Sequence, residues 1–250
     1  MFYWRSSTHT DAPGGPGAVE LRFTGRSAGR GTGPYAGLNL GGHVGDDAGD
    51  VEDNRRALAV ELGLPRDRVV FMNQVHGTDV VEVDGPWVGE PPAVDAVVTR
   101  APDLAVAVLV ADCVPVLLHD ATAGVLGAVH SGRPGMLAGI VGHAVTAMRD
   151  LGAHSITATV GPSVCGRCYE VPEEMARAAA ATTPAAAARS WAGTPAIDVA
   201  AGVVEQLAEA GVGVRWVAGC TREEPDLYSY RRDGRTGRFA GVALRRSVTA

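Results

Sequence analysis

Lysine is absent from the sequence, so all 22 basic residues are arginine. We interpret the use of arginine in place of every lysine as coding bias rather than as a property of one site. It still matters for binding, because any cationic side chain that holds a phosphate must be an arginine, whose planar guanidinium contacts an anion as a bidentate fork. The formal net charge of −6 argues against a general nucleic-acid-binding protein, which is usually basic.

Long apolar segments are absent as well. The N-terminal residues 1–15 lack the apolar core of a signal peptide, and the longest apolar run, which begins at Leu104, is too short to cross a bilayer. We therefore expect a cytoplasmic protein that does not contact a membrane. Cysteine is scarce, and the four present are Cys113, Cys165, Cys168 and Cys220. In a reducing compartment we expect them to be free thiols or metal ligands rather than disulfides.

Glycine and proline are abundant, with 33 and 15 residues in a chain of 250. This composition favours an α/β or α+β fold with many turns over a helical bundle. Short apolar segments typical of strands alternate loosely with helical patterns, and no internal repeat or linker divides them. We expect residues 1–17 to form a poorly ordered leader and residues 18–250 to form a single domain.

The periodicity of apolar residues predicts the individual elements. Strands are expected at residues 19–24, 69–75, 80–83, 93–99, 156–160 and 214–218, and three further apolar runs lie between Val106 and His130. Helices are expected after a cap at Asp50, at residues 136–151, at residues 172–182 and after a cap at Asp198. The glycine-rich residues 25–45 predict a long, ordered loop with a functional role.

One cysteine and two histidines stand out in this pattern. Cys113 follows a buried run in a turn with Asp112, His130 ends another buried run, and His76 comes from the upstream segment NQVHG. One thiolate and two imidazoles suit a zinc ion with an open fourth position, which is the ligand count of a catalytic site. Because the three residues come from separate segments, a core cysteine with two hydrogen-bonded histidines is the alternative.

Two other segments carry reactive or charged side chains. Cys165 and Cys168 have the Cys-x-x-Cys spacing shared by zinc sites and redox pairs, but the sequence shows no second pair and no thioredoxin-like context. We interpret them as a loop feature whose replacement by serine leaves the metal content unchanged. The segment YSYRRDGRTGR at residues 228–238 predicts either a solvated hairpin that turns at Asp233–Gly234 or a loop that binds an anion or nucleobase.

Six segments in order resemble those of the laccase-domain family: GPYAGLNLGGHVGDD, NQVHG, ADCVPVLL, AVHSGRPG, GPSVCGRCYEV and YSYRRDGRTGR. The similarity runs from about Phe23 to Leu244. Members of this family were long labelled multicopper polyphenol oxidases and are understood as zinc-dependent purine nucleoside phosphorylases that also deaminate adenosine. Bacterial members have also been called peptidoglycan editing factors.

The resemblance implies a fold of mixed β-sheets covered by helices, and a catalytic Zn²⁺ held by His76, Cys113 and His130. One departure follows His130, where the usual family form A-G-W-R-G is replaced by Ser131-Gly132-Arg133-Pro134-Gly135. If the family arginine holds phosphate, this role passes to Arg133 or to another residue. We expect Arg133, Arg231 and Arg232 to neutralise phosphate, and Asn39 and His43 to contact the nucleoside.

The hypothesis from the sequence is therefore a zinc-dependent purine nucleoside phosphorylase with adenosine deaminase activity, whose partners are a purine nucleoside and phosphate. Three alternatives remain. A copper polyphenol oxidase needs clustered histidines, which seven scattered histidines do not supply. Cys113 activated by His130 would give a metal-free hydrolase. The third alternative is a partner protein in peptidoglycan editing without chemistry of its own.

Overall fold

Strand β6 (Ala105–Val110) is buried along its whole length because both faces of its sheet are covered. Its residues alternate between two apolar clusters. Ala105, Ala107 and Leu109 pack in the cluster under helix α1 (Ala48–Glu61), whereas Val106, Val108 and Val110 face a second sheet. The same period of two, set by the pleat of a strand, places Val116 of strand β7 (Val114–Asp120) outward and Leu117 inward.

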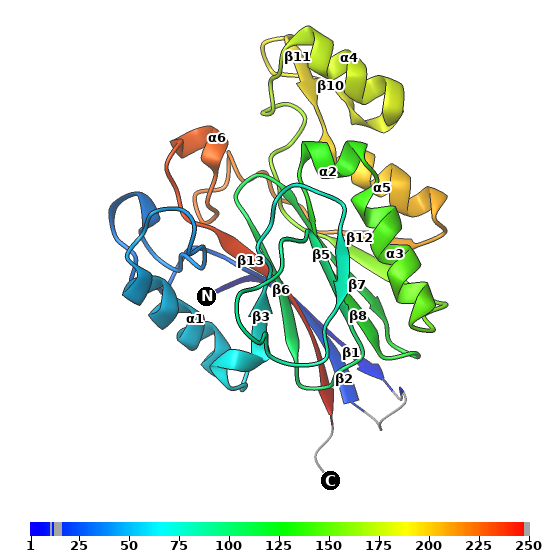
Figure 1. Cartoon of the computed structure of the whole chain (residues 1–250). Coiled ribbons are helices and arrows are strands. Elements are labelled where there is room, and N and C mark those ends of the chain that lie inside the picture. Colours follow the sequence, from blue (N-terminus) through cyan, green and yellow to red (C-terminus); the bar gives the residue numbers. More distant parts are fainter. Residues whose placement is uncertain (11, 13–16, 248–250) are drawn as a thin grey trace.

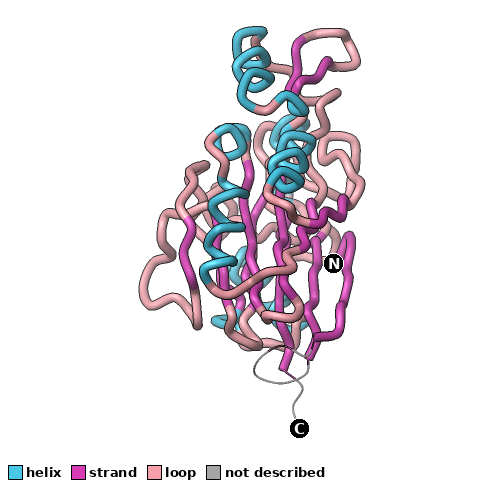
Figure 2. Tube along the Cα trace, turned by 90° about the vertical axis from the view of Figure 1, so that its right-hand side faces the viewer, coloured by secondary structure: helices cyan, strands magenta, loops and turns pink. Residues whose placement is uncertain are grey.

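The computed structural model describes residues 1–10, 12 and 17–247, and it stacks two mixed sheets between helices (Figures 1 and 2). The first sheet has the order β1 (Phe2–Thr10), β2 (Gly17–Thr24), β13 (Phe239–Ser247), β6 and β3 (Val69–Phe71). The second has the order β12 (Gly213–Trp216), β9 (Thr157–Val160), β7, β8 (Val125–Ser131), β5 (Ala96–Thr99) and β4 (Val80–Glu82). The predicted fold of mixed sheets covered by helices is confirmed.

Helices cover the two outer faces of this stack. Helix α1 packs on the first sheet, and α3 (Ile140–Asp150) and α5 (Val199–Glu209) pack on the second. The remaining elements are α2 (Arg133–Leu137), α4 (Glu173–Thr182), α6 (Tyr230–Asp233), the ribbon of β10 (Ala187–Arg189) and β11 (Pro195–Ile197), and 3₁₀ turns at Gly33–Tyr35, Arg66–Arg68 and Pro184–Ala186. In the part of the chain that the structure describes, no helix combines the length and apolarity needed to cross a membrane.

The expected leader is wrong for the described residues of this segment. β1 pairs antiparallel with β2, and the Trp4 ring lies 5.7 Å from the Phe23 ring. The hydroxyl of Tyr3 donates a hydrogen bond of 3.1 Å to the carbonyl of Ala218. Aromatic and β-branched residues are typical of strands, so the composition of β1 already favoured this outcome. Residues 11 and 13–16 of the expected leader lie outside the described residues.

Two helix predictions also need correction. Helix α1 begins one turn earlier than expected, because Asp47 rather than Asp50 is its N-cap and accepts hydrogen bonds from the backbone of Gly49 and Asp50. The helix expected at residues 136–151 is divided into α2 and α3. Gly139 between them has a φ of 82°, a left-handed conformation that an α-helix does not contain and that glycine adopts easily.

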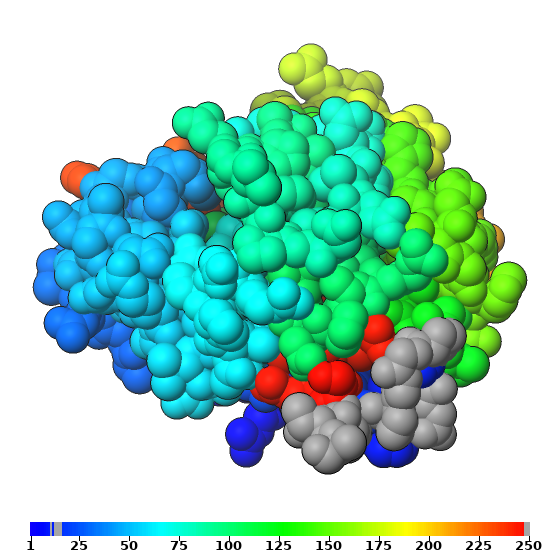
Figure 3. All heavy atoms as spheres, turned by 60° about the horizontal axis from the view of Figure 1, so that its bottom comes forward, coloured from blue at the N-terminus to red at the C-terminus, as the bar shows by residue number. Residues whose placement is uncertain are grey.

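The chain crosses between the two sheets at Asp112 and Cys113, because β6 belongs to the first sheet and β7 to the second. The start of β13 lies against the end of β6, with Phe239 opposite Val110. Loops from distant parts of the sequence therefore meet at this end of the stack. At the opposite end, the red C-terminal part of β13 lies beside dark-blue atoms of the N-terminal strands (Figure 3).

Candidate active site

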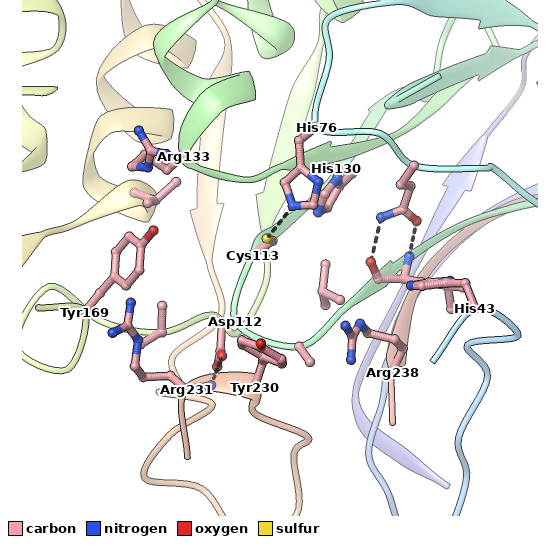
Figure 4. A pocket seen from close by; sticks show the side chains of 16 residues that line it. His43, His76, Asp112, Cys113, His130, Arg133, Tyr169, Tyr230, Arg231 and Arg238 are labelled. Atoms are coloured by element: carbon pink, nitrogen blue, oxygen red, sulfur yellow. Dashed lines mark hydrogen bonds between the residues drawn. The ribbon is translucent and has the colours of Figure 1, made fainter. Parts of the chain in front are cut away.

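Three side chains with metal-binding atoms meet where the chain crosses between the sheets. The Sγ atom of Cys113 lies 3.7 Å from Nε2 of His76, and the rings of His76 and His130 meet edge to face with centroids 4.7 Å apart. One ligand atom from each of the three residues lies within 4.8 Å of the others. Figure 4 shows His76, His130 and Cys113 pointing toward one another. The sequence predicted this trio, and the fold brings it together.

Asp95, which the sequence reasoning missed, positions both histidines. Its Oδ1 lies 2.7 Å from Nδ1 of His130 and accepts the backbone N–H of His76 at 2.9 Å. Its Oδ2 accepts the backbone N–H of Gly77 at 2.6 Å. Because a carboxylate only accepts hydrogen bonds, Nδ1 of His130 carries the proton and Nε2 stays free to bind a metal.

The charge state of Asp95 is stabilised by the same contacts. Burial alone raises the pKa of this carboxyl, but the hydrogen bonds from His130 and from the backbone lower the pKa below its usual value. The signal available in the sequence was an acidic residue inside the apolar segment at residues 93–99. The structure buries Asp95 fully, and acidic residues are rarely buried without a partner.

The Cys113 thiol and the His130 imidazole change each other's protonation. Burial raises the pKa of Cys113, but the imidazoles of His130 and His76 outweigh it and lower the pKa to about 6. Burial lowers the pKa of His130, whereas the Cys113 sulfur and Asp95 raise it to about 9. Without a metal, the two groups form a thiolate and an imidazolium at neutral pH. The thiolate is the form of cysteine that binds metals.

Main-chain geometry allows the donors to come this close. His76 has a φ of 62°, which is uncommon for a residue other than glycine and fits a site that the surrounding contacts hold in place. Gly132 passes directly behind the donors, since a Cβ atom there would lie 2.6 Å from Cδ2 of His76 and 3.2 Å from Sγ of Cys113. The donor set and this cradle fit one small ion with soft and imidazole ligands.

The donors lie in the wall of a cavity of about 400 Å³. Its other polar and aromatic lining residues are His43, Gln74, Asp112, Arg133, Tyr169, Tyr230, Arg231 and Arg238. In Figure 4, Arg133, Tyr169 and Arg231 lie on one side of the donors, and His43 and Arg238 lie on the other. Three arginines thus converge on one cavity, which is a favourable environment for an anion.

Two predicted contact residues do not line this cavity. Asn39 is fully buried, where its Oδ1 accepts the backbone N–H of Arg238 at 2.8 Å and its Nδ2 donates to Asp46 at 2.8 Å. The guanidinium of Arg232 donates to the backbone carbonyls of Thr221, Glu224 and Leu227. Both residues hold loops together, so we no longer expect them to contact the nucleoside or phosphate.

Arg238, rather than the predicted Arg232, lines the cavity. It directly precedes β13, and the pairing of β13 with β6 carries it to the cavity. Burial lowers its pKa, while nearby Cys113 and Asp112 raise it. Of the two alternatives for this segment, the hairpin that turns at Asp233–Gly234 is wrong, because helix α6 ends there, with Gly234 at a φ of 68°. The sequence indicated an anion-binding loop here but not which arginine faces the cavity.

Asp112 connects the loops on the arginine side. It has a φ of 97°, and its Oδ1 accepts hydrogen bonds of 2.6 Å from the hydroxyls of both Thr221 and Ser229. Its Oδ2 accepts the backbone N–H of Arg231 at 2.6 Å. Asp112, the neighbour of Cys113, therefore fixes helix α6 and, with it, the position of Arg231 in the cavity.

The fold and the donor trio define a class of protein in which a candidate metal site lies where the chain crosses between two mixed sheets. Residues 20–246 match the family described as multi-copper polyphenol oxidoreductase laccase, so the chain belongs to this family. A protein of Streptomyces griseus named purine nucleoside phosphorylase ORF3 is 56% identical over 230 residues, which cover 90% of this chain and 94% of the relative. The Mycobacterium tuberculosis protein named purine nucleoside phosphorylase Rv2149c is 46% identical, with 95% and 98% covered.

Solved structures agree with this assignment. YlmD of Geobacillus stearothermophilus superposes with a TM-score of 0.83 at 33% identity and covers 92% of each chain. The Neisseria meningitidis protein NMB0706 superposes with a TM-score of 0.82 at 32% identity, covering 96% of this chain and 99% of that one.

Proposed function

We propose that this protein is a zinc-dependent purine nucleoside phosphorylase that also deaminates adenosine. The observation that carries the proposal is the presence of an open three-donor metal site and three arginines in one cavity. A volume of about 400 Å³ is in the range of small-molecule sites. The names of the similar Streptomyces and Mycobacterium proteins support the substrate class.

His76, Cys113 and His130 would hold the zinc ion. One thiolate and two imidazoles leave a fourth tetrahedral position for water or substrate. A zinc ion bound there supplies Lewis acidity to an oxygen atom of water or substrate. A multicopper oxidase would need further clusters of histidines, and among the described residues this trio is the only group of possible ligands that contains histidine.

The arginines of the cavity would bind phosphate. Arg133 stands at the start of α2, and the Arg231 guanidinium lies 4.8 Å from the centre of the Tyr169 ring. In phosphorolysis a phosphate oxygen forms a bond to C1′ of ribose, while the bond from C1′ to N9 breaks and the purine leaves with the electron pair. Arginine forks near the phosphate hold it in line and neutralise its charge.

His43 and Tyr230 would contact the purine. Burial and the charges of Arg238 and Arg55 lower the pKa of His43, so its imidazole is neutral at pH 7 and can both donate and accept a proton. Tyr230 is 62% exposed at the cavity and offers a ring face for stacking. Deamination replaces the C6 amino group by an oxygen from water and releases ammonia, a step that requires such a proton carrier.

The test follows adenine and inosine separately by chromatography, with adenosine as substrate and with or without phosphate. We expect adenine release that depends on phosphate and inosine formation that does not. Arg133→Ala should weaken phosphate use by about one to two orders of magnitude, since a charged hydrogen bond contributes roughly 1.5–3 kcal/mol. Inosine formation should fall much less. The exposed Arg177→Ala serves as the matched control.

Each negative result has its own meaning. Inosine without adenine at any phosphate concentration would leave a deaminase and remove the phosphorylase. Equal loss of both activities in Arg133→Ala would mean that this side chain supports the whole cavity rather than phosphate. Elemental analysis separates the other candidates, because several coppers per chain would identify an oxidase and activity without metal would favour a Cys113 and His130 hydrolase.

A further inference from the structure

Two tight turns outside the active-site cavity place three sulfur atoms and one carboxylate side by side. In the first turn, the backbone N–H of Cys168 donates to the carbonyl of Cys165 at 2.9 Å. In the second, the backbone N–H of Glu223 donates to the carbonyl of Cys220 at 3.0 Å. The side-chain ligand atoms of these four residues lie within 4.8 Å of one another.

The sheet explains why these turns meet. Strands β9 and β12 are parallel neighbours, and the two turns follow their carboxyl ends, which lie at the same edge. Ser163 and Cys220 form a bridge between the two segments, in which the backbone N–H of Thr221 donates to the carbonyl of Ser163 at 3.0 Å. The sequence suggested that Cys-x-x-Cys lacked a second pair. The fold supplies one as Cys220-x-x-Glu223, so that premise is wrong.

Contacts within the cluster already orient the four groups. The thiol of Cys168 donates to Oε1 of Glu223 at 3.2 Å, and the backbone N–H of Cys165 donates to Sγ of Cys220 at 3.5 Å. The Trp191 indole N–H donates to the same carboxylate oxygen at 3.3 Å. Hydrogen bonds of this kind, to a ligand from a second layer of residues, fix the orientation of metal ligands in known sites.

We propose that Cys165, Cys168, Cys220 and Glu223 bind a structural zinc ion. Thiolates select zinc over the hard cations magnesium and calcium, and four protein ligands fill the tetrahedral shell, which is the mark of a structural site. Zinc–sulfur bonds of about 2.3 Å place tetrahedral sulfurs about 3.8 Å apart, so ligand atoms that lie within 4.8 Å of one another need to close by no more than about 1 Å when the ion binds. Each thiol gives up its proton to solvent. The guanidinium of Arg222, which hydrogen-bonds Cys168, offsets part of the negative charge of three thiolates and a carboxylate.

This ion would stabilise one wall of the active-site cavity. Val164 and Tyr169, which flank the first turn, line the cavity. Thr221, in the second turn, bonds to Asp112 next to Cys113. The zinc therefore joins two loops that hold the cavity in shape, without taking part in the chemistry at His76, Cys113 and His130.

The test uses the full-length Cys113→Ala protein, because this substitution removes a ligand of the other site and leaves Cys165, Cys168 and Cys220 as the remaining thiols. Elemental analysis should still find about one zinc per chain. A thiol reagent should react slowly until a chelator is added, and then titrate three thiols as the zinc is released. Loaded with cobalt instead, the same protein should show the thiolate-to-cobalt charge-transfer absorption.

Further substitutions, each combined with Cys113→Ala, identify which residues bind the remaining zinc. Cys220→Ser should lose the remaining zinc, and Glu223→Gln should bind it more weakly, whereas the neighbouring Glu224→Gln should keep it. A Cys113→Ala protein without zinc, with freely reactive thiols or with a disulfide found by mass spectrometry, overturns the proposal. Zinc retained in Cys220→Ser also overturns it. If Cys220→Ser fails to fold, the thiol titration and the cobalt spectrum of Cys113→Ala decide alone.

Discussion

At the residue scale, Gly132 allows the side chains of His76 and Cys113 to lie close together. The main chain at this position leaves no room for a methyl group beside His76 and Cys113. Asp95 accepts the backbone N–H of His76, so the main chain of His76 cannot move away freely. A substituent at residue 132 therefore has to displace a ligand.

We expect Gly132→Ala to lower zinc occupancy at this site well below that of the unmodified protein while the protein stays folded. Elemental analysis should show a loss of up to one zinc ion per chain, with the ion proposed at Cys165, Cys168, Cys220 and Glu223 retained, and circular dichroism measures folding. Gly142→Ala in helix α3 is the control, since a Cβ there meets nothing within 4 Å and alanine favours helix. Unchanged occupancy in Gly132→Ala would mean that His76 is not a ligand or moves without cost.

The protonation of Cys113 gives a second prediction at this scale. In protein stripped of metal, the rate of Cys113 alkylation should rise with pH through about 6 and then level off, because the thiolate is the reacting form and its pKa is lowered to about 6. Mass spectrometry of the Cys113 peptide follows the reaction. A rate that keeps rising to the ordinary thiol pKa near 9 would contradict the thiolate and imidazolium pair.

At the element scale, Asn39 connects the glycine-rich loop to the start of β13. Its amide group bonds to the backbone N–H of Arg238 and Gly41 and to the carboxylate of Asp46. Its backbone carbonyl accepts a hydrogen bond of 2.9 Å from Asn54 of α1. The position of Arg238 and His43 in the cavity therefore depends on a residue that does not line it.

We expect Asn39→Ala to destabilise the protein by about 2–4 kcal/mol, because it leaves buried hydrogen-bonding groups without partners. The midpoint of denaturant unfolding measures this loss, and Asn73→Ala at an exposed position is the control. If Asn39→Ala raised KM for the nucleoside without any loss of stability, the substrate contact predicted from the sequence would be right after all.

At the scale of the whole molecule, the N-terminal strand completes the first sheet. β1 forms the edge of that sheet, and its aromatic residues Tyr3 and Trp4 pack against the apolar cluster between the two sheets. A disordered leader would contribute nothing to this cluster. The strand also lies far along the chain from the residues it contacts, such as Ala218.

Removal of residues 1–10 should lower the thermal midpoint by at least about 5 °C, since each kcal/mol lost shifts the midpoint by about 2–4 °C in a chain of this size. Differential scanning calorimetry measures the change. The metal content should stay the same, because the donors lie at other elements. A midpoint that does not move would restore the leader interpretation.

The sequence by itself determined most strands, most helices and the trio of His76, Cys113 and His130, but not strand β1, whose residues were expected to form a leader. Continuous apolar runs such as β6 and β7 are explicit in the chain because sheets covered on both faces require them. The chemistry of the trio was readable because cysteine and histidine have few other reasons to end buried strands. Helix boundaries were less readable, since Asp47 and Asp50 are equally good caps.

Only the tertiary structure decided which polar residues face the cavity. Asn39 and Arg232 look like ligand-binding residues in the sequence, but their orientation depends on hydrogen bonds to segments far away in the chain. Arg238, Asp95 and the pair of Cys220 and Glu223 gain their roles from strand pairing, which no local pattern encodes. Side-chain chemistry is local, whereas the meeting of side chains is set by the packing of the whole fold.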